Sequence, residues 1–220
     1  MTDPLLADGP LPDDAKSAPD DRAEAGPLDE GEANAVRPYV DLGGVKLVPR
    51  ADLQLRLEVD ESSKRVVAVS IDYAGSTLQV QPFAAPRSSG LWHEIRHQIA
   101  EQIRSQGGEI TERSGSFGPE LLARIPVNGA QAGTTRVARF IGVDGPRWFL
   151  RGVVAGEGAA DATAAAAIDD VFRSIVVVRG TTPMPPRDLI PLQVPQGATT
   201  APTTSSTSAS PTTSAPSVSS

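Results

Sequence analysis

The stretch that decides the fold is residues 136–155, RVARFIGVDGPRWFLRGVVA. Two apolar runs flank Asp144 and Gly145, and an Asp-Gly pair between such runs predicts a β-hairpin with a tight two-residue turn. Neither run alternates cleanly between apolar and polar residues, which indicates that both faces of the hairpin are covered. We therefore expect this hairpin at the centre of a sheet, with Trp148 and Phe140 in the core.

Other segments predict further strands. Leu53, Leu55 and Leu57 alternate with polar residues, which is the period-two pattern of a half-buried strand. The links between consecutive strands are short, and this favours an antiparallel meander because parallel pairs need long crossovers. Besides the hairpin, the expected strands are residues 45–48, 53–59, 65–73, 77–84, 109–113, 121–127 and 176–178.

Two helices are expected beside these strands. Apolar residues recur every four positions from Leu91 onward, as in an amphipathic helix that ends at Gly107. Ser88 or Ser89 is the expected cap at its start. Residues 161–175 predict a second helix with one apolar side. The predicted fold class is therefore α+β, an antiparallel sheet of six or seven strands covered by two main helices.

The two ends of the chain differ from its middle. Residues 1–36 are rich in Asp, Pro, Ala and Gly and carry few large apolar groups, so we expect a disordered acidic tail. Residues 196–220 consist almost wholly of Ser, Thr, Pro and Ala, and a second disordered tail is expected there. A single α+β domain is expected over residues 39–195, with the proline-rich segment 183–195 extended along its surface.

Charge and composition exclude several classes of function. Residues 1–36 hold ten acidic residues against Lys16 and Arg22, a net charge of −8, whereas the whole chain carries −7. The remainder is therefore close to neutral and offers no basic field for nucleic acid or anionic lipid. The chain has no cysteine, which excludes disulfides, thiolate metal sites and a cysteine nucleophile. We find no secretory signal or long apolar run, and we expect a cytoplasmic protein with no membrane contact.

The string His93-Glu94-Ile95-Arg96-His97 matches H-E-x-x-H, in which two imidazoles bind zinc and the glutamate is a general base. Both imidazoles lie opposite the apolar stripe of the predicted helix, so they face solvent and not a cleft. A catalytic zinc also needs a third protein ligand, for which Glu101 is the nearest candidate in sequence. A solvated helix face is the alternative that we favour.

Three arginines of the hairpin form a candidate ligand site, namely Arg139, Arg147 and Arg151. Such a cluster can bind an anion or stack with aromatic rings against a nucleotide. The simpler alternative is local ion pairing, with the arginine stems covering apolar surface. The carboxylates expected in such pairs are Asp144, Asp169 and Asp170.

Several blocks of the sequence together resemble one known family. They include YVDLGGVKL, FAAPRSSGLWHEIRHQIAEQI, GVDGPRWFLRGVV and PMPPRDLIPLQVP. Over about residues 39–195 the chain resembles an actinobacterial family of uncharacterised alanine-, glycine- and valine-rich proteins encoded near dUTPase. The resemblance implies no catalytic residue, and it speaks against zinc because members carry acidic residues at the positions of His93 and His97. The order of elements also resembles the Mog1/PsbP-like sandwich, a likeness that does not fix function.

The function expected from these observations is that of a non-enzymatic binding or adaptor module with a protein partner and no cofactor. Two alternatives stay open. One is a zinc-dependent hydrolase that uses His93, Glu94 and His97, and the other is nucleotide or anion binding at the hairpin arginines.

Overall fold

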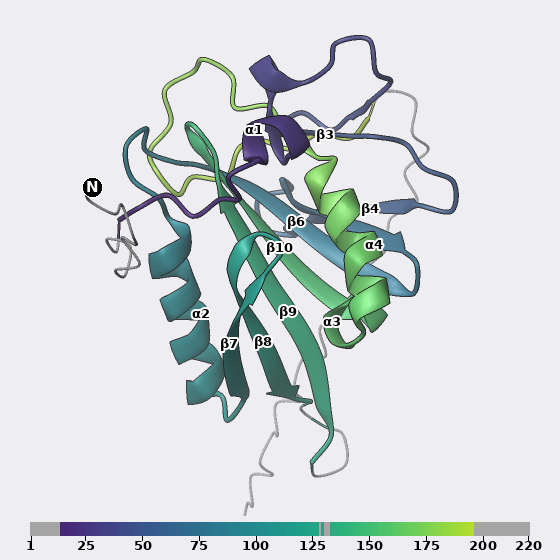
Figure 1. The fold of residues 1–220 in the computed structure, drawn as a ribbon, viewed down its shortest axis with the longest axis vertical. Helices are drawn as coiled ribbons and strands as arrows, with labels where there is room; N and C mark the ends of the chain where they lie inside the picture. Colours follow the sequence, from purple (N-terminus) through teal and green to yellow (C-terminus); the bar gives the residue numbers. More distant parts are fainter. Residues whose placement is uncertain (1–13, 128, 130–132, 196–220) are drawn as a thin grey trace, which may run out of the picture.

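The middle layer of the fold is a seven-stranded antiparallel sheet with the strand order β4-β5-β6-β10-β9-β8-β7 (Figure 1). The computed structural model describes residues 14–127, 129 and 133–195. The hairpin quoted above supplies β9 (Thr135–Asp144) and β10 (Trp148–Gly156), and β10 is the fourth of the seven strands. The predicted α+β class and the central position of the hairpin are both confirmed.

Two meanders make up this sheet, and they meet where β6 pairs with β10. Helix α2 (Trp92–Ser105) connects the first meander to the second. All strands of the sheet were expected from the sequence, to within a few residues at their ends. The other strands are β4 (Gln54–Val59), β5 (Val66–Tyr73), β6 (Ser76–Ala84), β7 (Glu109–Gly115) and β8 (Gly118–Pro126).

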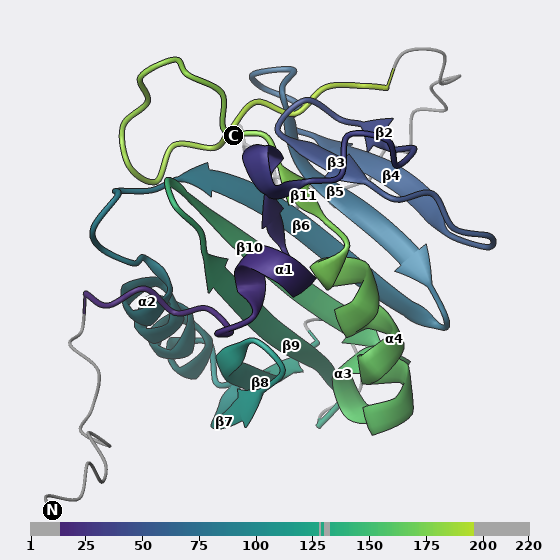
Figure 2. The ribbon, with the colours of Figure 1, turned by 45° about the horizontal axis from the view of Figure 1, so that its top comes forward.

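A second sheet of four short strands, in the order β1-β11-β3-β2, lies beside the first (Figure 2). Only two of its strands were expected, because strands of two or three residues show no periodicity. Apolar residues of β3 and β11 join the core on the α4 side of the main sheet. The four strands are β1 (Leu28–Asp29), β2 (Val40–Asp41), β3 (Val45–Leu47) and β11 (Val176–Val177).

Helices pack on both faces of the main sheet. On one face, α4 (Ala162–Arg173) packs Phe172 into a core that includes Trp148 of β10. On the other face, α2 buries Trp92 against Phe149, with the ring centroids 5.8 Å apart. The remaining helical segments are α1 (Arg22–Ala25), α3 (Glu157–Ala160) and a 3₁₀ turn at Glu30–Glu32. Within the described residues, none of the helices is both long and apolar enough to span a membrane.

The turn of the central hairpin differs from the expected one. Asp144 ends β9 in register with Phe149, and the N–H of Gly145 donates to the carbonyl of Trp148 at 2.8 Å. Neither Asp144 nor Gly145 has the positive φ that a two-residue Asp-Gly turn requires. The reason is Pro146, because a residue that precedes proline is driven to extended backbone.

The carboxylate of Asp144 instead caps helix α2. It accepts hydrogen bonds from the backbone N–H groups of Leu91 at 2.8 Å and Trp92 at 3.3 Å. The helix has no cap from its own neighbouring side chains, so the expected cap by Ser88 or Ser89 is wrong. The cap is instead a side chain at the end of a strand about 50 residues later in the chain.

Residues 14–36 differ from the disordered tail expected over residues 1–36. Ser17 donates its N–H to the Asp144 carboxylate at 3.0 Å and accepts from the Asp144 N–H at 2.8 Å. Further along, Asp29 accepts a hydrogen bond from the indole of Trp148 at 2.9 Å. These polar contacts to distant residues help to hold the segment, and the composition of the segment does not reveal them. Residues 1–13 and 196–220 lie outside the described part of the chain.

The proline-rich segment 183–195 pairs with the start of β5 and the end of β6 in the main sheet and with Gly43, just before β3. The N–H of Ile190 donates to the carbonyl of Pro82, and the N–H of Gln193 donates to that of Leu42. Ile190 is only 2 % exposed, so the segment is part of the core as well as of the surface.

Replacing Trp148 by alanine is expected to destabilise the fold by about 3–5 kcal/mol, because the indole is fully buried and leaves a cavity. Urea unfolding of the purified chain measures this loss. Val59→Ala, at a side chain that is 51 % exposed, is the control and is expected to stay within about 0.5 kcal/mol of wild type. A similar loss in both variants would contradict the burial of Trp148.

Asp144 gives the fold a pH dependence of known sign. Burial raises the pKa of its carboxyl above the usual 3.8, although the backbone N–H groups of Leu91, Ser17 and Trp92 oppose the shift. The folded chain therefore holds this proton more tightly than the unfolded chain. The resulting stability is present at low pH and is lost as the pH rises through the raised pKa.

Comparing wild type with Asp144→Asn isolates this effect. The free energy of unfolding of wild type relative to the variant is expected to fall as the pH rises from about 4 to about 7. Urea titrations at each pH measure the difference. A difference that is constant or that rises with pH would show that the pKa of Asp144 is not raised.

Candidate functional site

The face of the main sheet that carries α2 is only partly covered. Helix α2 packs over β7, β8 and β9, whereas β6 shows strict alternation of buried and half-buried residues. Phe83 stacks on Phe149 at 6.1 Å between ring centroids, which places the half-buried residues of β6 on the α2 face. Strand register then assigns their neighbours to the same face. We call this surface the open half, made of Gln54, Arg56, Glu58, Ser70, Asp72, Thr77, Gln79, Gln81, Phe83 and Arg151.

The carboxylates of the open half already have partners within it. Arg56 donates to both oxygens of Asp72 at 2.9 Å, and Gln79 donates to Glu58 at 2.6 Å. Although burial alone would raise the pKa of Asp72, hydrogen bonds from Thr77 and Arg56 lower it. Both carboxylates are therefore hydrogen-bonded within the open half. Neither is available to the second cation of this surface, which lies at its other side.

Arg151 is that cation, and it lacks a counter-charge. Its guanidinium donates to the neutral amide oxygen of Gln81 and lies over the ring of Phe83, 5.9 Å from the centroid. Its Nε is buried without a hydrogen-bond partner, and no carboxylate of the described residues pairs with it. Burial lowers the pKa of Arg151, as expected for a cation with no anion near it.

An unpaired, half-buried guanidinium is unfavourable until an anion reaches it. A carboxylate or phosphate of a ligand would supply the missing counter-charge, and the planar guanidinium can bind either group with two parallel hydrogen bonds. Phe83 holds the guanidinium from one side through a cation–π contact. The arrangement is suited to binding an anionic group.

Arg139 points to the opposite face, towards α4. It is 2 % exposed and pairs with Asp169 and with Glu120, both at 2.8 Å. Although burial opposes the charge, these two carboxylates raise the pKa of Arg139. The ion pair with Asp169 is the simpler alternative that the sequence suggested. Because both carboxylates occupy the guanidinium of Arg139, it is not available to a ligand.

Arg147 lies in the turn of the hairpin and donates to the carbonyl of Gly180 at 3.1 Å. The three hairpin arginines are therefore not brought together. Asp144 and Asp170, the other acids expected to pair with them, are used elsewhere: Asp144 caps α2 and Asp170 pairs with Arg50 at 2.6 Å.

The H-E-x-x-H string lies on the outer side of α2. The imidazole rings of His93 and His97 are 4.6 Å apart, and His97 is exposed. Glu94 pairs with Arg187 of the proline-rich segment and accepts from Gln98. Within the described residues, no three His, Asp or Glu side chains converge as metal ligands. This geometry contains no third ligand and no free general base for the hydrolase alternative.

Sequence reasoning missed Gln81 and Phe83, the two residues that contact Arg151. They belong to β6, 70 positions earlier in the chain for Gln81, and only the pairing of β6 with β10 brings them to the site. The separation of Arg139 from Arg151 could have been found. Both the expected turn and the observed one place these two residues on opposite faces, since the pairing of the strands has the same parity in either case.

Comparison with known sequences places the chain in a family. The sequence profile of a family described as "Protein of unknown function (DUF3710)" matches residues 26–201. The chain belongs to this family. No curated protein matches it. The family match begins before residue 39, in the segment that packs against the hairpin.

One solved structure is similar in shape, the solution structure of cyanobacterial PsbP (CyanoP) from Synechocystis sp. PCC 6803. It is 16 % identical, and the alignment covers 69 % of this chain and 99 % of that chain with a TM-score of 0.37. PsbP is the fold type that the order of elements suggested, but a likeness at this level carries no argument about site or function.

Replacing Arg139 by methionine is expected to cost about 3–5 kcal/mol, because it removes the counter-charge of the buried Asp169 and one of the two arginines that pair with the buried Glu120. Urea unfolding measures the loss. Arg136→Met, at an exposed position of the same strand, is the matched control and should change stability by no more than about 0.5 kcal/mol. If both variants kept wild-type stability, the buried ion network would not hold α4 to the sheet.

Proposed function

We propose that this chain is a non-enzymatic binding module that recognises a protein partner with the open half of its sheet. Arg151 receives a carboxylate of the partner. The observation that carries this proposal is the half-buried guanidinium of Arg151, which has an unpartnered Nε and no carboxylate contact.

The character of the surface favours a protein over a small ligand. Small ligands bind in concave, mostly apolar pockets. Arg151 does not line the groove beside the proline-rich segment or the groove that includes Gln54, Asp72 and Thr77 of the open half. The open half extends over four strands and combines two arginines and an aromatic ring with amide, hydroxyl and carboxylate groups. Arginine and aromatic residues are the commonest strong contributors at protein interfaces, and hydrogen-bonding groups suit their rims.

The setting of this function is also proposed. We infer a cytoplasmic protein of actinobacterial type, encoded near dUTPase, as the resemblance of the sequence implies. The near-neutral charge outside residues 1–36 supports a protein partner over nucleic acid.

Charge reversal at Arg151 tests the proposal. Immobilised full-length chain, as wild type, Arg151→Glu and Arg147→Glu, is used to capture proteins from native extract, and the affinity of each purified candidate is then titrated. The Arg151 variant is expected to bind the partner about thirtyfold more weakly or worse, as for a loss of about 2 kcal/mol at a central interface arginine. Arg147→Glu carries the same charge change in the same hairpin and is expected to bind like wild type.

Unfolding midpoints of the three proteins establish that each is folded. A partner that binds wild type and Arg151→Glu equally well would refute the role of Arg151. A thermal shift with nucleotides or inorganic phosphate that disappears in Arg151→Glu would replace the protein partner with a small anion.

A further inference from the structure

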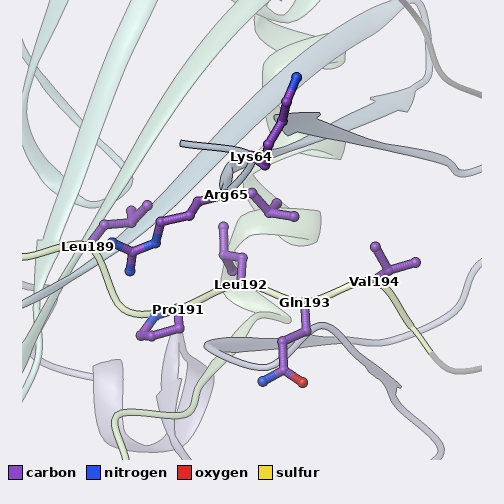
Figure 3. Close-up of a pocket in the computed structure, with 8 residues that line it drawn as sticks. Lys64, Arg65, Leu189, Pro191, Leu192, Gln193 and Val194 are labelled. Atoms are coloured by element: carbon purple, nitrogen blue, oxygen red, sulfur yellow. The ribbon is translucent and has the colours of Figure 1, made fainter. Parts of the chain in front are cut away.

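A groove of about 360 Å³ lies between the start of β5 and the proline-rich segment, away from Arg151 (Figure 3). Lys64 and Arg65 form one side of it, and Leu189, Pro191 and Leu192 form the other. In Figure 3 the Arg65 side chain extends along the groove towards Leu189, while Lys64 projects from its rim. The groove therefore combines two adjacent positive charges with an apolar wall.

The two cations are exposed, and within the described residues no carboxylate pairs with either of them. Two acids precede the cations closely in the chain. Asp60 is engaged by Ser62 and Ser63 at 2.6–2.7 Å, and Glu61 forms no salt bridge with either cation. Lys64 itself has a φ of 56° and closes the turn by donating its N–H to the carbonyl of Asp60 at 2.8 Å. The turn thus presents both cations without neutralising them.

The apolar wall is held in place from two sides. Leu192 bridges Gly43 and Val66, which lie in different parts of the fold, and the carbonyl of Pro191 accepts from Gly44 at 2.8 Å. The wall continues to Val194, which is 43 % exposed. The groove is consequently a formed feature of the fold. Leu192 is only 7 % exposed, so the apolar surface open to a ligand is that of Leu189, Pro191 and Val194.

A fitting ligand is an extended segment that carries both carboxylates and aliphatic side chains. Residues 1–13, MTDPLLADGPLPD, have this composition. They contain Asp3, Asp8 and Asp13 with no lysine or arginine, and their leucines lie between these aspartates in the sequence. The charge of this segment is therefore opposite to that of the groove, which favours their association.

The segment is also long enough to reach the groove. The carbonyl of Asp14 accepts from Gly90 at 2.8 Å, and the N–H of Ala84 donates to Asp188, next to the groove, at 2.8 Å. Five residues separate Ala84 from Gly90, so Asp14 lies within about 30 Å of Asp188, whereas thirteen extended residues span about 45 Å.

We propose that residues 1–13 dock in the groove of their own chain. The aspartates lie against Lys64 and Arg65, and the leucines cover the accessible apolar surface of Leu189, Pro191 and Val194.

Paramagnetic broadening tests this docking. Because the chain has no cysteine, Ala7→Cys gives a single attachment site for a spin label. In the full-length, isotope-labelled chain, the amide signals of Val66, Leu192 and Val194 are expected to lose intensity with the label attached. The loss is expected to disappear in Lys64→Glu/Arg65→Glu and in Asp3→Asn/Asp8→Asn/Asp13→Asn.

Arg136→Glu, an exposed charge reversal at the far end of β9, is the matched control and should keep the loss of intensity. Unchanged groove signals in the labelled wild type would overturn the proposal. A second experiment mixes spin-labelled chain at natural isotope abundance with isotope-labelled chain that carries no spin label. Broadening of the groove signals in this mixture would also overturn the proposal, since the segment would then bind a second copy.

Discussion

One buried carboxylate joins the parts of this fold. Asp144 is 2 % exposed and accepts backbone N–H groups from the start of α2 and from Ser17, while its own backbone ends β9. The charge is tolerated because three donors from two other segments surround it. Since β9 belongs to the central hairpin, this contact sets where α2 begins on the sheet. The extent of the open half follows from it, because the helix covers only the strands on one side of β10.

Most of the sheet could be predicted from local patterns. The period-two alternation of β4 and the apolar runs around Asp144 identified strands, and the four-residue spacing after Leu91 identified α2. The cap of α2 and the order in residues 14–36 could not be predicted, since both depend on hydrogen bonds to Asp144 from distant parts of the chain. The turn itself was open to prediction, because Pro146 restricts the residue before it. An Asp-Gly pair that is followed by proline therefore does not by itself predict a two-residue turn.

The candidate site was predictable only in part. The sequence predicts Arg151 as one of three arginines in a candidate ligand site, but its distinction from Arg139 depends on what each contacts across the sheet. Arg139 meets Asp169 of α4, whereas Arg151 meets Gln81 and Phe83 of β6. The sequence shows which residues of a strand share a face of the sheet, because side chains alternate, but it does not show which strand lies next to it. The pairing of β6 with β10 joins two meanders across a helix, and no local pattern encodes that choice.

The burial of the two tryptophans has a consequence for observing this molecule. Trp92 and Trp148 are the chain's only indoles, both are fully buried, and they lie on opposite faces of the sheet. Trp92 reports the layer between the sheet and α2, while Trp148 reports the layer beneath α4 and the N-terminal segment. Each layer therefore has its own intrinsic fluorophore. Tryptophan fluorescence can report the unfolding of one layer separately from global unfolding without an added dye.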